Sequence, residues 1–303
     1  MALTIAAKAA CVPSQLEDRI SKGFRAVEII TFEDQLRNSF KLMQKVLRTY
    51  SGGLEFVSIH APSELTISDA VDEEYRKRGL LCLEKAMRLA ARVNCKRVTF
   101  HAFQNVSKLG TINDMVSLRD RAFQKCVEGI QSLNYLCEDL DVTLCLENIN
   151  ACVHLNQVFY LIFSASPHDL LRVLKEINSN FLNLCFDIAH AHNTCNFVLQ
   201  NPRMKELFNI DKLTPEGFYE LINSYVGLIH ISDAKGTIGG KGTDNLPLGK
   251  GEIDFRRVLE PILLNGPRSP IVLEIDETDV NDAKNMLEGR RFLSRIITER
   301  KLQ

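Results

Sequence analysis

Residues 182–192 have the sequence LNLCFDIAHAH, and this stretch decides the fold. From Leu182 to Phe186 the run is almost continuously apolar, and a carboxylate, Asp187, follows at once. Such a run is typical of a strand buried on both faces of a parallel sheet, because a half-exposed antiparallel strand alternates apolar and polar residues. The stretch therefore predicts a buried parallel strand with an ionisable residue at its carboxyl end.

The same pattern recurs along the rest of the chain. The seven further runs are LTIAA from residue 3, AVEIIT from 26, EFVSIH from 55, KRVTFH from 96, VTLCLE from 142, VGLIHIS from 226 and PIVLEI from 270. Amphipathic stretches separate them, most clearly residues 73–94, where Leu80, Leu83 and Met87 recur at helical spacing. Eight buried strands alternating with helices predict an α/β fold, a single (βα)8 TIM barrel, as one domain over residues 1–303.

Local signals place further helices between these strands. The segment TPEGFYELINSY begins with Thr214, a favourable N-cap, and Pro215, which suits the first helical position. Helices are also expected over residues 117–140 and 279–297.

Two long stretches, residues 191–213 and 234–252, show no clear pattern and are expected to be irregular. Each directly follows a predicted strand. Both are therefore expected at the C-terminal mouth of the barrel, where active sites of this architecture are built.

Composition excludes several classes of protein. The chain has 303 residues, of which 45% are hydrophobic and 25% are charged, as in an ordinary soluble globular protein. Its net charge is −1, from 37 basic and 38 acidic side chains, so there is no overall positive field of the kind that drives nonspecific nucleic-acid binding. No linker, low-complexity tract or repeat divides the chain.

Targeting and redox signals favour the cytoplasm. No run approaches the roughly 18–20 apolar residues that span a bilayer, and the start, MALTIAAKAACV, lacks a basic region before its short apolar run. We expect Met1 to Lys8 to form a strand and expect no membrane partner. The nine cysteines include no CxxC pair, and Cys145 and Cys185 lie inside apolar runs, which favours free thiols in a reducing compartment.

Ionisable residues stand at or just beyond the ends of six consecutive predicted strands, the third to the eighth. They are His60, His101, Glu147, Asp187, His230 and Glu274. In a closed barrel the strand ends converge around one axis, so residues far apart in sequence meet there. Alone, each would more often be a hydrogen-bonded structural residue. Together, converging charges require pairing or a cation, and the sequence therefore predicts a divalent-metal site.

The sequence around these positions resembles one known superfamily. The matching fragments are HAP at 60–62, LEN at 146–148, FDIAHAH at 186–192, IHISDAKG at 229–236, DNLPLGKGEID at 244–254 and LEID at 273–276. Together, and in this order, they resemble the xylose isomerase-like barrels over essentially the whole chain. That group includes sugar and sugar-phosphate isomerases and epimerases, and the endonuclease IV nucleases of abasic DNA.

The isomerase and epimerase branches imply a set of ligands and a mechanism. In them the metal is held by Glu, Asp, His and Glu of the last four strands, which correspond to Glu147, Asp187, His230 and Glu274. An oxygen-rich site with one imidazole suits Zn²⁺, Mn²⁺ or Mg²⁺. The two glutamates resemble the pair that moves the substrate proton, so Glu147 and Glu274 are the candidate catalytic residues; the alternative is that they are ligands only.

The nuclease branch implies a three-zinc site, for which His60, His101 and His190 match. Its further Asp-x-His pair is replaced here by Asp244-Asn245-Leu246, and an apolar Leu246 cannot ligate zinc. One or two ions per chain are therefore expected instead of three. His60 and His101 would complete a second metal site with Glu147 or contact the substrate.

Weaker candidates for the substrate, or for an additional metal, are His190, Asp244, Glu28 and Lys235. Glu28 ends the second predicted strand, where a structural ion pair is an equal alternative. Lys235 would bind a phosphate or neutralise an enolate, although a solvated loop lysine is the more common case. His192 is interpreted as structural.

The sequence thus favours a metal-dependent isomerase or epimerase of a small carbohydrate-like substrate, acting by proton transfer beside a carbonyl. The alternative is an endonuclease IV-like zinc phosphodiester hydrolase, which alone would make nucleic acid a partner; Leu246 and the near-neutral charge count against it. A non-catalytic barrel is disfavoured because the four ligand positions are intact. Association into a homo-oligomer through outer helices is possible for such barrels.

Overall fold

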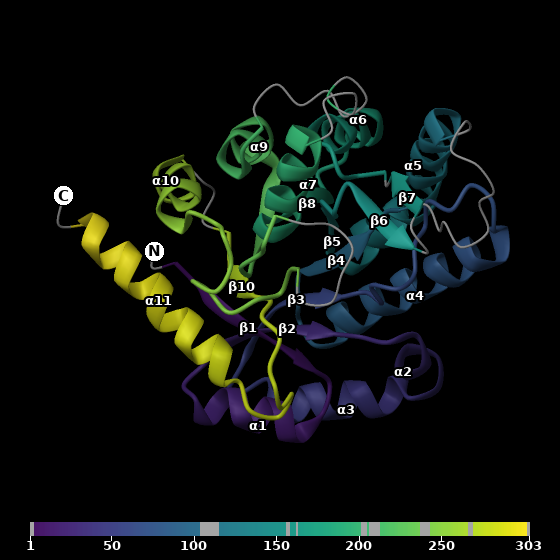
Figure 1. The fold of residues 1–303 in the computed structure, drawn as a ribbon. Coiled ribbons are helices and arrows are strands. Elements are labelled where there is room, and N and C mark those ends of the chain that lie inside the picture. Colours follow the sequence, from purple (N-terminus) through teal and green to yellow (C-terminus); the bar gives the residue numbers. More distant parts are fainter. Residues whose placement is uncertain are drawn as a thin grey trace.

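Eight parallel strands close into a barrel with helices outside it in the computed structural model (Figure 1). The structure describes residues 3–103, 115–155, 158–161, 163–200, 205, 213–236, 243–265 and 269–301. Around the barrel the strands run β1 (Ile5–Ala10), β10 (Ile271–Leu273), β9 (Val226–Ile231), β8 (Leu182–Asp187), β5 (Thr143–Glu147), β4 (Arg97–His101), β3 (Glu55–His60) and β2 (Ala26–Ile30). All eight expected strands are present, so the predicted fold class is confirmed.

Helices follow the strands and cover the outside of the barrel. They are α1 (Pro13–Ser21), α2 (Glu33–Asn38), α3 (Phe40–Tyr50), α4 (Glu73–Arg92), α5 (Met115–Leu140), α6 (Pro167–Ile177), α7 (Ile188–Gln200), α9 (Pro215–Ile222), α10 (Phe255–Asn265) and α11 (Lys284–Lys301), with a 3-10 turn over Asn223–Tyr225. As expected, Thr214 caps α9: its side chain accepts a hydrogen bond from the Gly217 N–H.

Three expectations about element bounds need correction. The first strand, expected over Met1 to Lys8, begins at Ile5 and extends to Ala10; Met1 and Ala2 lie outside the described residues. Residues 191–200, expected to be irregular, belong to α7, which begins directly after β8. The last helix begins at Lys284 and not at Asp279. A short antiparallel pair, β6 (Cys152–Leu155) and β7 (Val158–Leu161), lies between β5 and α6 and was not expected.

The two ends of the chain meet where the barrel closes. Strand β1 pairs with β10, and α11 lies near α1 (Figure 1). The Asp18 carboxylate accepts a hydrogen bond from the Ala283 N–H at 2.9 Å, and Arg290 donates to the carbonyl oxygens of Lys22 and Gly23 at 2.8 Å each. These contacts join the first and last βα units.

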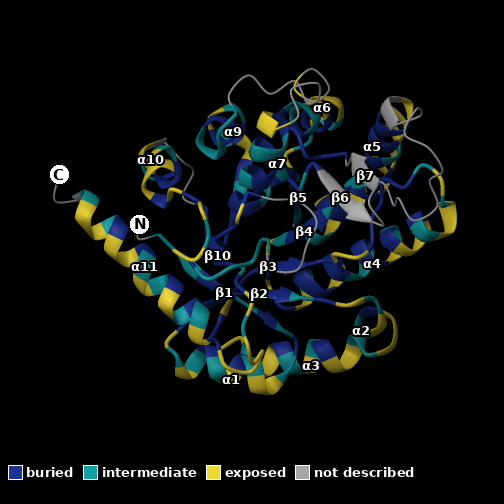
Figure 2. Cartoon of the chain, in the orientation of Figure 1, coloured by how far each residue is buried: buried dark blue, intermediate teal, exposed yellow. Residues whose placement is uncertain are grey.

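Burial follows the layers of the barrel (Figure 2). The main apolar core lies between the strands and the helices. A smaller apolar cluster, which we call the inner layer, fills the barrel and consists of Ala6, Ala26, Val57, Cys145, Cys185, Leu228 and Val272. The eight cysteines whose side chains the structure describes are buried and free. Within the described residues, no helix is long and apolar enough to cross a membrane.

Candidate metal centre

Strand alternation points the candidate ligands into the barrel. Side chains two residues apart on a strand lie on the same face, and four of the candidates stand two residues after a member of the inner layer. These pairs are Cys145 and Glu147, Cys185 and Asp187, Leu228 and His230, and Val272 and Glu274. Each ligand candidate therefore lies one step above the inner layer, toward the C-terminal mouth of the barrel.

Strand β3 reaches the same position by a different route. The register between β2 and β3 shifts between Val27 and Glu28, so that one extra residue is accommodated in β3. An irregularity of this kind redirects the side chains beyond it. It allows Val57 to join the inner layer while His60, three residues later, also faces the mouth.

Four side chains gather tightly enough to share one cation. One oxygen or nitrogen from each of Glu147, Asp187, His230 and Glu274 lies within 4.8 Å of the corresponding atom of every other. His60 forms a second such group with Glu147 and His230. The first three side chains are fully buried, and that of Glu274 is 18% exposed.

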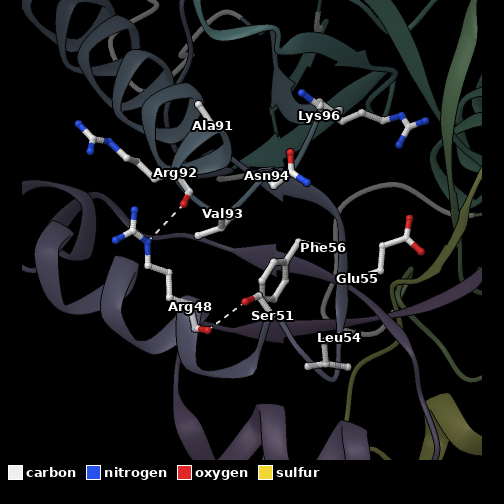
Figure 3. A pocket seen from close by; sticks show the side chains of 11 residues that line it. Arg48, Ser51, Leu54, Glu55, Phe56, Ala91, Arg92, Val93, Asn94 and Lys96 are labelled. Atoms are coloured by element: carbon white, nitrogen blue, oxygen red, sulfur yellow. Dashed lines mark hydrogen bonds between the residues drawn. The ribbon is translucent and has the colours of Figure 1, made fainter.

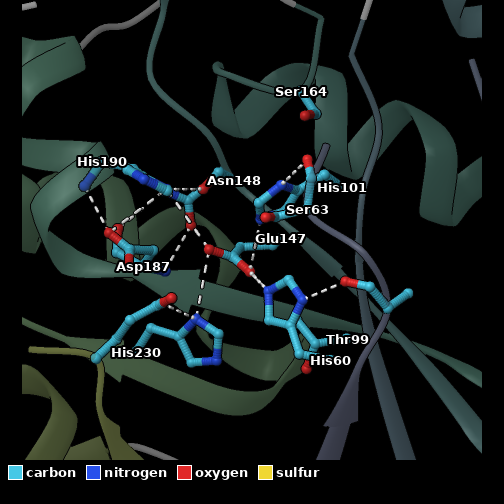
Figure 4. A network of polar contacts seen from close by, with 12 residues as sticks. His60, Ser63, Thr99, His101, Glu147, Asn148, Ser164, Asp187, His190 and His230 are labelled. Carbon is cyan, nitrogen blue, oxygen red and sulfur yellow. Dashed lines mark hydrogen bonds and ion pairs between the residues drawn. The ribbon is translucent and has the colours of Figure 1, made fainter. Parts of the chain in front are cut away.

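Glu147 lies at the centre of the cluster (Figure 4). Its Oε2 lies 3.2 Å from Nε2 of His60 and 3.2 Å from Nε2 of His101. Its Oε1 lies 3.4 Å from Nδ1 of His230 and 3.5 Å from Nδ1 of His190. One carboxylate thus faces four imidazoles from β3, β4, β9 and the start of α7.

His230 is held on both sides. Its Nδ1 lies 2.8 Å from Oε2 of Glu274, and its Nε2 lies 3.0 Å from Oε1 of Glu28. Glu28 is buried and also accepts a hydrogen bond from Thr99 at 3.0 Å. A carboxylate behind a histidine fixes the orientation and tautomer of a metal-ligating imidazole, so Nδ1 is the nitrogen that faces the candidate metal position.

Asp187 has two duties at the end of β8. Its Oδ1 accepts a hydrogen bond from the His190 N–H at 2.6 Å, which caps the first turn of α7. Asn148 locks its backbone by donating to the Asp187 carbonyl at 2.9 Å and accepting from the Asp187 N–H at 2.8 Å. The cap therefore fixes one carboxylate oxygen and leaves Oδ2 for another partner.

The electrostatics reflect burial opposed by close charges. Burial alone would raise the pKa of Glu147, but His230 and His101 outweigh it and hold that pKa well below its usual range. Burial raises the pKa of Asp187 to about 7, and the Glu147 charge adds to this effect. For His60, burial lowers the pKa, yet Glu147 and Glu28 together raise it to about 9.

Several buried atoms in this ring, most of them in the ion pairs described above, make no well-directed hydrogen bond within the described part of the chain. They are Glu147 Oε1, Asp187 Oδ2, His101 Nε2, and Nδ1 and Nε2 of His230. Buried polar groups are rarely left in this state. A divalent cation would satisfy Glu147 Oε1, Asp187 Oδ2 and His230 Nδ1 at once. An oxygen-rich set with one imidazole suits Mg²⁺, Mn²⁺ or Zn²⁺. The residues present therefore fit a metal ion.

The weaker candidates differ in how close they lie to the cluster. His190 lies in the ring, and Asp244 accepts a hydrogen bond from Asn150 at 3.0 Å, outside the four-residue group. Lys235 is exposed, and its backbone N–H donates to the Thr243 carbonyl. The Leu246 N–H donates to the Asp233 carbonyl, and the Asp233 N–H donates to the Leu246 carbonyl.

Sequence reasoning missed Lys8. Its Nζ lies 4.0 Å from Oε1 of Glu274 and 3.5 Å from Oδ1 of Asp276. The available signal was a single lysine in the otherwise apolar strand IAAKAA, two residues after Ala6 of the inner layer.

A separate hollow of about 590 Å³ lies at the opposite end of the barrel, where β3 and β4 begin (Figure 3). Arg48, Arg92, Lys96 and Arg97 line it. Arg48 donates to the carbonyl of Arg92, the last residue of α4. Cations at helix carboxyl ends offset the partial negative charge of the last turn, so this basic hollow has a structural explanation.

The chain is similar to one known family and to several known proteins. The family described as a xylose isomerase-like TIM barrel matches residues 20–296. An uncharacterized protein of Methanocaldococcus jannaschii is 24% identical over 245 residues, covering 80% of this chain and 72% of that protein. A D-tagatose 3-epimerase-like protein superposes with a TM-score of 0.72 at 20% identity, over 98% of this chain and 99% of its own. For 3-keto-D-glucoside 4-epimerase from E. coli the TM-score is 0.68 at 18% identity, over 97% and 100%. At these identities the structural likeness establishes the fold.

Proposed function

We propose, from the premise that this chain belongs to the xylose isomerase-like TIM-barrel family, that it is a divalent-metal-dependent isomerase or epimerase of a sugar or related hydroxy-ketone. The observation that carries the proposal is the buried group of Glu147, Asp187, His230 and Glu274, whose ligand atoms lie within 4.8 Å of one another. The epimerase names of similar structures support it.

The chemistry divides between the ion and the chain. A Zn²⁺, Mn²⁺ or Mg²⁺ ion held by these four residues would polarise a carbonyl and acidify the neighbouring C–H. Glu147 ends β5 and Glu274 directly follows β10; around the barrel these strands are separated by β8 and β9, which carry Asp187 and His230. The two glutamates thus flank the ligand arc and approach a substrate from different sides.

Two flanking carboxylates can move a proton across a carbon centre. One carboxylate takes the proton from carbon, and the bonding electrons pass to the carbonyl oxygen. The other carboxylate, in its protonated form, returns a proton to the opposite face, which inverts that carbon. His230 and His101 hold the pKa of Glu147 well below its usual range against the effect of burial, so its carboxylate is ionised.

A second function rests on a specific observation: His60 and His101 both lie 3.2 Å from Glu147, and His190 lies beside Asp187. That arrangement favours a second ion and keeps an endonuclease IV-like zinc phosphodiester hydrolase as the alternative. Leu246 and the net charge of −1 count against it.

We further propose that residues 1–303 act as one domain. The free thiols favour a reducing compartment such as the cytoplasm.

Exchange of substrate protons with solvent tests this function. Metal-loaded protein is incubated in deuterated buffer with D-fructose, D-tagatose, L-ribulose and polyol-derived ketones, and loss of the C–H signal is followed by NMR. Wild type is expected to exchange at least one of these. Glu147→Gln and Glu274→Gln are expected to slow exchange by about a thousandfold while keeping part of the metal, because an amide still offers a lone pair but cannot accept a proton.

Three outcomes would count against the proposal. The isomerase function fails if metal-loaded wild type exchanges nothing across the panel. The assignment of paired glutamates fails if the metal-loaded Glu147→Gln protein exchanges at the wild-type rate. Robust cleavage of abasic duplex DNA by the wild type would favour the hydrolase.

A further inference from the structure

We propose that Lys8 is a substrate-binding residue, whose ammonium donates hydrogen bonds to an oxygen of a neutral keto-sugar lying beside Glu274. This inference rests on the proposed isomerase function and adds both a residue and a substrate class to it. Lys8, a lysine inside the barrel, would then neutralise the charge of the enolate, a role for which the sequence had suggested the exposed Lys235.

The position of Lys8 is set by the sheet. Its Cα is the register partner of the Cα of Glu28 on β2, and Glu28 reaches His230 inside the barrel. Lys8 stands two residues after Ala6 of the inner layer, as the metal-ligand candidates stand after theirs. Its side chain is only 15% exposed, so most of it lies within the mouth of the barrel.

The ammonium lacks close acceptors. Its distances to Glu274 and Asp276, 4.0 and 3.5 Å, exceed those of good N–H···O hydrogen bonds. Among the described residues, Nζ donates no hydrogen bond, and Asp276 is 74% exposed, so that pair contributes little. An ammonium with no good acceptor among the described residues has its donors available to a bound molecule. Substrate hydroxyl and carbonyl oxygens supply such acceptors.

The charges of the mouth decide the substrate class. Four buried or nearly buried carboxylates face it: Glu28, Glu147, Asp187 and Glu274. Of the described lysines and arginines, Lys8 alone forms an ion pair with any of these four. No described arginine or second lysine stands with Lys8 in these pairs, so the set of cationic donors that ordinarily binds a phosphate group is missing there. The mouth therefore suits the hydroxyl and carbonyl oxygens of a neutral keto-sugar.

Lys8 then acts where charge develops. When one of the two glutamates takes the substrate proton, negative charge moves onto the carbonyl oxygen. An ammonium already fixed near Glu274 stabilises that charge without having to reorganise. Lys8 itself transfers no proton in this scheme, so its loss should affect binding of the charged form without emptying the metal site.

The test compares Lys8→Met and Lys8→Arg with Lys250→Met, a matched loss of an exposed lysine on the loop that follows β9. Each protein is loaded with Mn²⁺, its metal content is measured, and binding of glycolohydroxamate, a small bidentate mimic of the charged intermediate, is followed by calorimetry. Lys8→Met is expected to keep the wild-type metal content and to bind the probe at least tenfold more weakly. Lys8→Arg is expected to recover part of that loss, and Lys250→Met to match the wild type.

The outcomes separate this inference from the proposed function. Equal probe affinity in Lys8→Met and wild type overturns the role of Lys8, whether or not the wild type exchanges substrate protons. Loss of metal in Lys8→Met also overturns it, because Lys8 would then be structural. The substrate class is overturned if D-tagatose 6-phosphate exchanges faster than D-tagatose. If no ketose exchanges but probe binding still depends on Lys8, the isomerase function is overturned instead.

Discussion

The inner layer and the ring above it occupy the same barrel but have opposite chemistry. The inner layer is made of small and aliphatic side chains, all but fully buried. Two residues later on six of the strands, the inward side chain is ionisable: Lys8, Glu28, Glu147, Asp187, His230 and Glu274 follow Ala6, Ala26, Cys145, Cys185, Leu228 and Val272. The comparison shows that a step of two residues along a strand separates the apolar side chains that fill the barrel from those to which our proposal assigns its chemistry.

The two layers also differ in how their burial is compensated. Apolar side chains in the inner layer gain from leaving water. The ring above buries carboxylates and imidazoles, several of whose atoms make no well-directed hydrogen bond in the described part of the chain. Uncompensated buried charge opposes folding. This contrast supports our proposal that the ring is a binding site that a cation completes.

A pair of substitutions on β9 should separate the layers most sharply. His230→Ala removes the imidazole that lies between Glu274 and Glu28. Losing one of four ligands is expected to weaken metal binding about a thousandfold, or about 4 kcal/mol. The measurement is competition with a calibrated chelator. Retention of wild-type affinity would show that His230 is no ligand.

The matched change two residues earlier is Leu228→Ala, in the inner layer. Leu228 is fully buried, so the substitution leaves a cavity and should lower the free energy of unfolding by about 3 kcal/mol. Metal content per folded chain is expected to stay at the wild-type value. Urea unfolding of both metal-free variants checks the first claim; a loss of metal equal to that of His230→Ala would erase the distinction between the layers.

Much of this arrangement follows from the sequence alone. The eight strands were predictable because each is an apolar run, and the ring was predictable because six of these runs, the third to the eighth, end in a potential ligand, as in Asp187 and Glu274. Helix α7 was missed because its residues are mostly buried and show no polar face. The cap that starts it, Asp187, is at the same time a candidate ligand, so its helix signal was interpreted as metal chemistry alone.

Other features depend on contacts that no local pattern contains. Glu28 was expected to reach the substrate or form a structural pair, and it lies behind His230. Lys8 lacked any motif, and its importance emerges only when β1 closes against β10. The pair of β6 and β7 consists of strands of only four residues each, too short for periodicity to distinguish from a loop.

The smallest expected effect on stability is that of replacing Asp18, a carboxylate outside both layers. Burial would raise the pKa of Asp18, but hydrogen bonds from Lys22, Ala283 and Arg19 lower it overall. Since the folded-state pKa is depressed, the stabilisation is present above the unfolded value of about 4 and disappears as pH falls through the folded-state pKa. Asp18→Asn should therefore cost about 1 kcal/mol at pH 7 and progressively less toward pH 2.

Urea unfolding of Asp18→Asn at several pH values, with the exposed Asp139→Asn as control, measures this effect. The control is expected to differ little from wild type throughout. A cost for Asp18→Asn that does not change with pH would mean that its carboxylate charge is irrelevant to the closure of the barrel.

The central claim is that the ring above the inner layer is a divalent-metal site, and counting the ions tests it most directly. Protein purified without added metal, and again after reconstitution with Zn²⁺, Mn²⁺ or Mg²⁺ and removal of the excess, is analysed by inductively coupled plasma mass spectrometry. We predict one or two ions per chain, bound by the group centred on Glu147. No ion after reconstitution, or three tightly held zinc ions, would contradict the account.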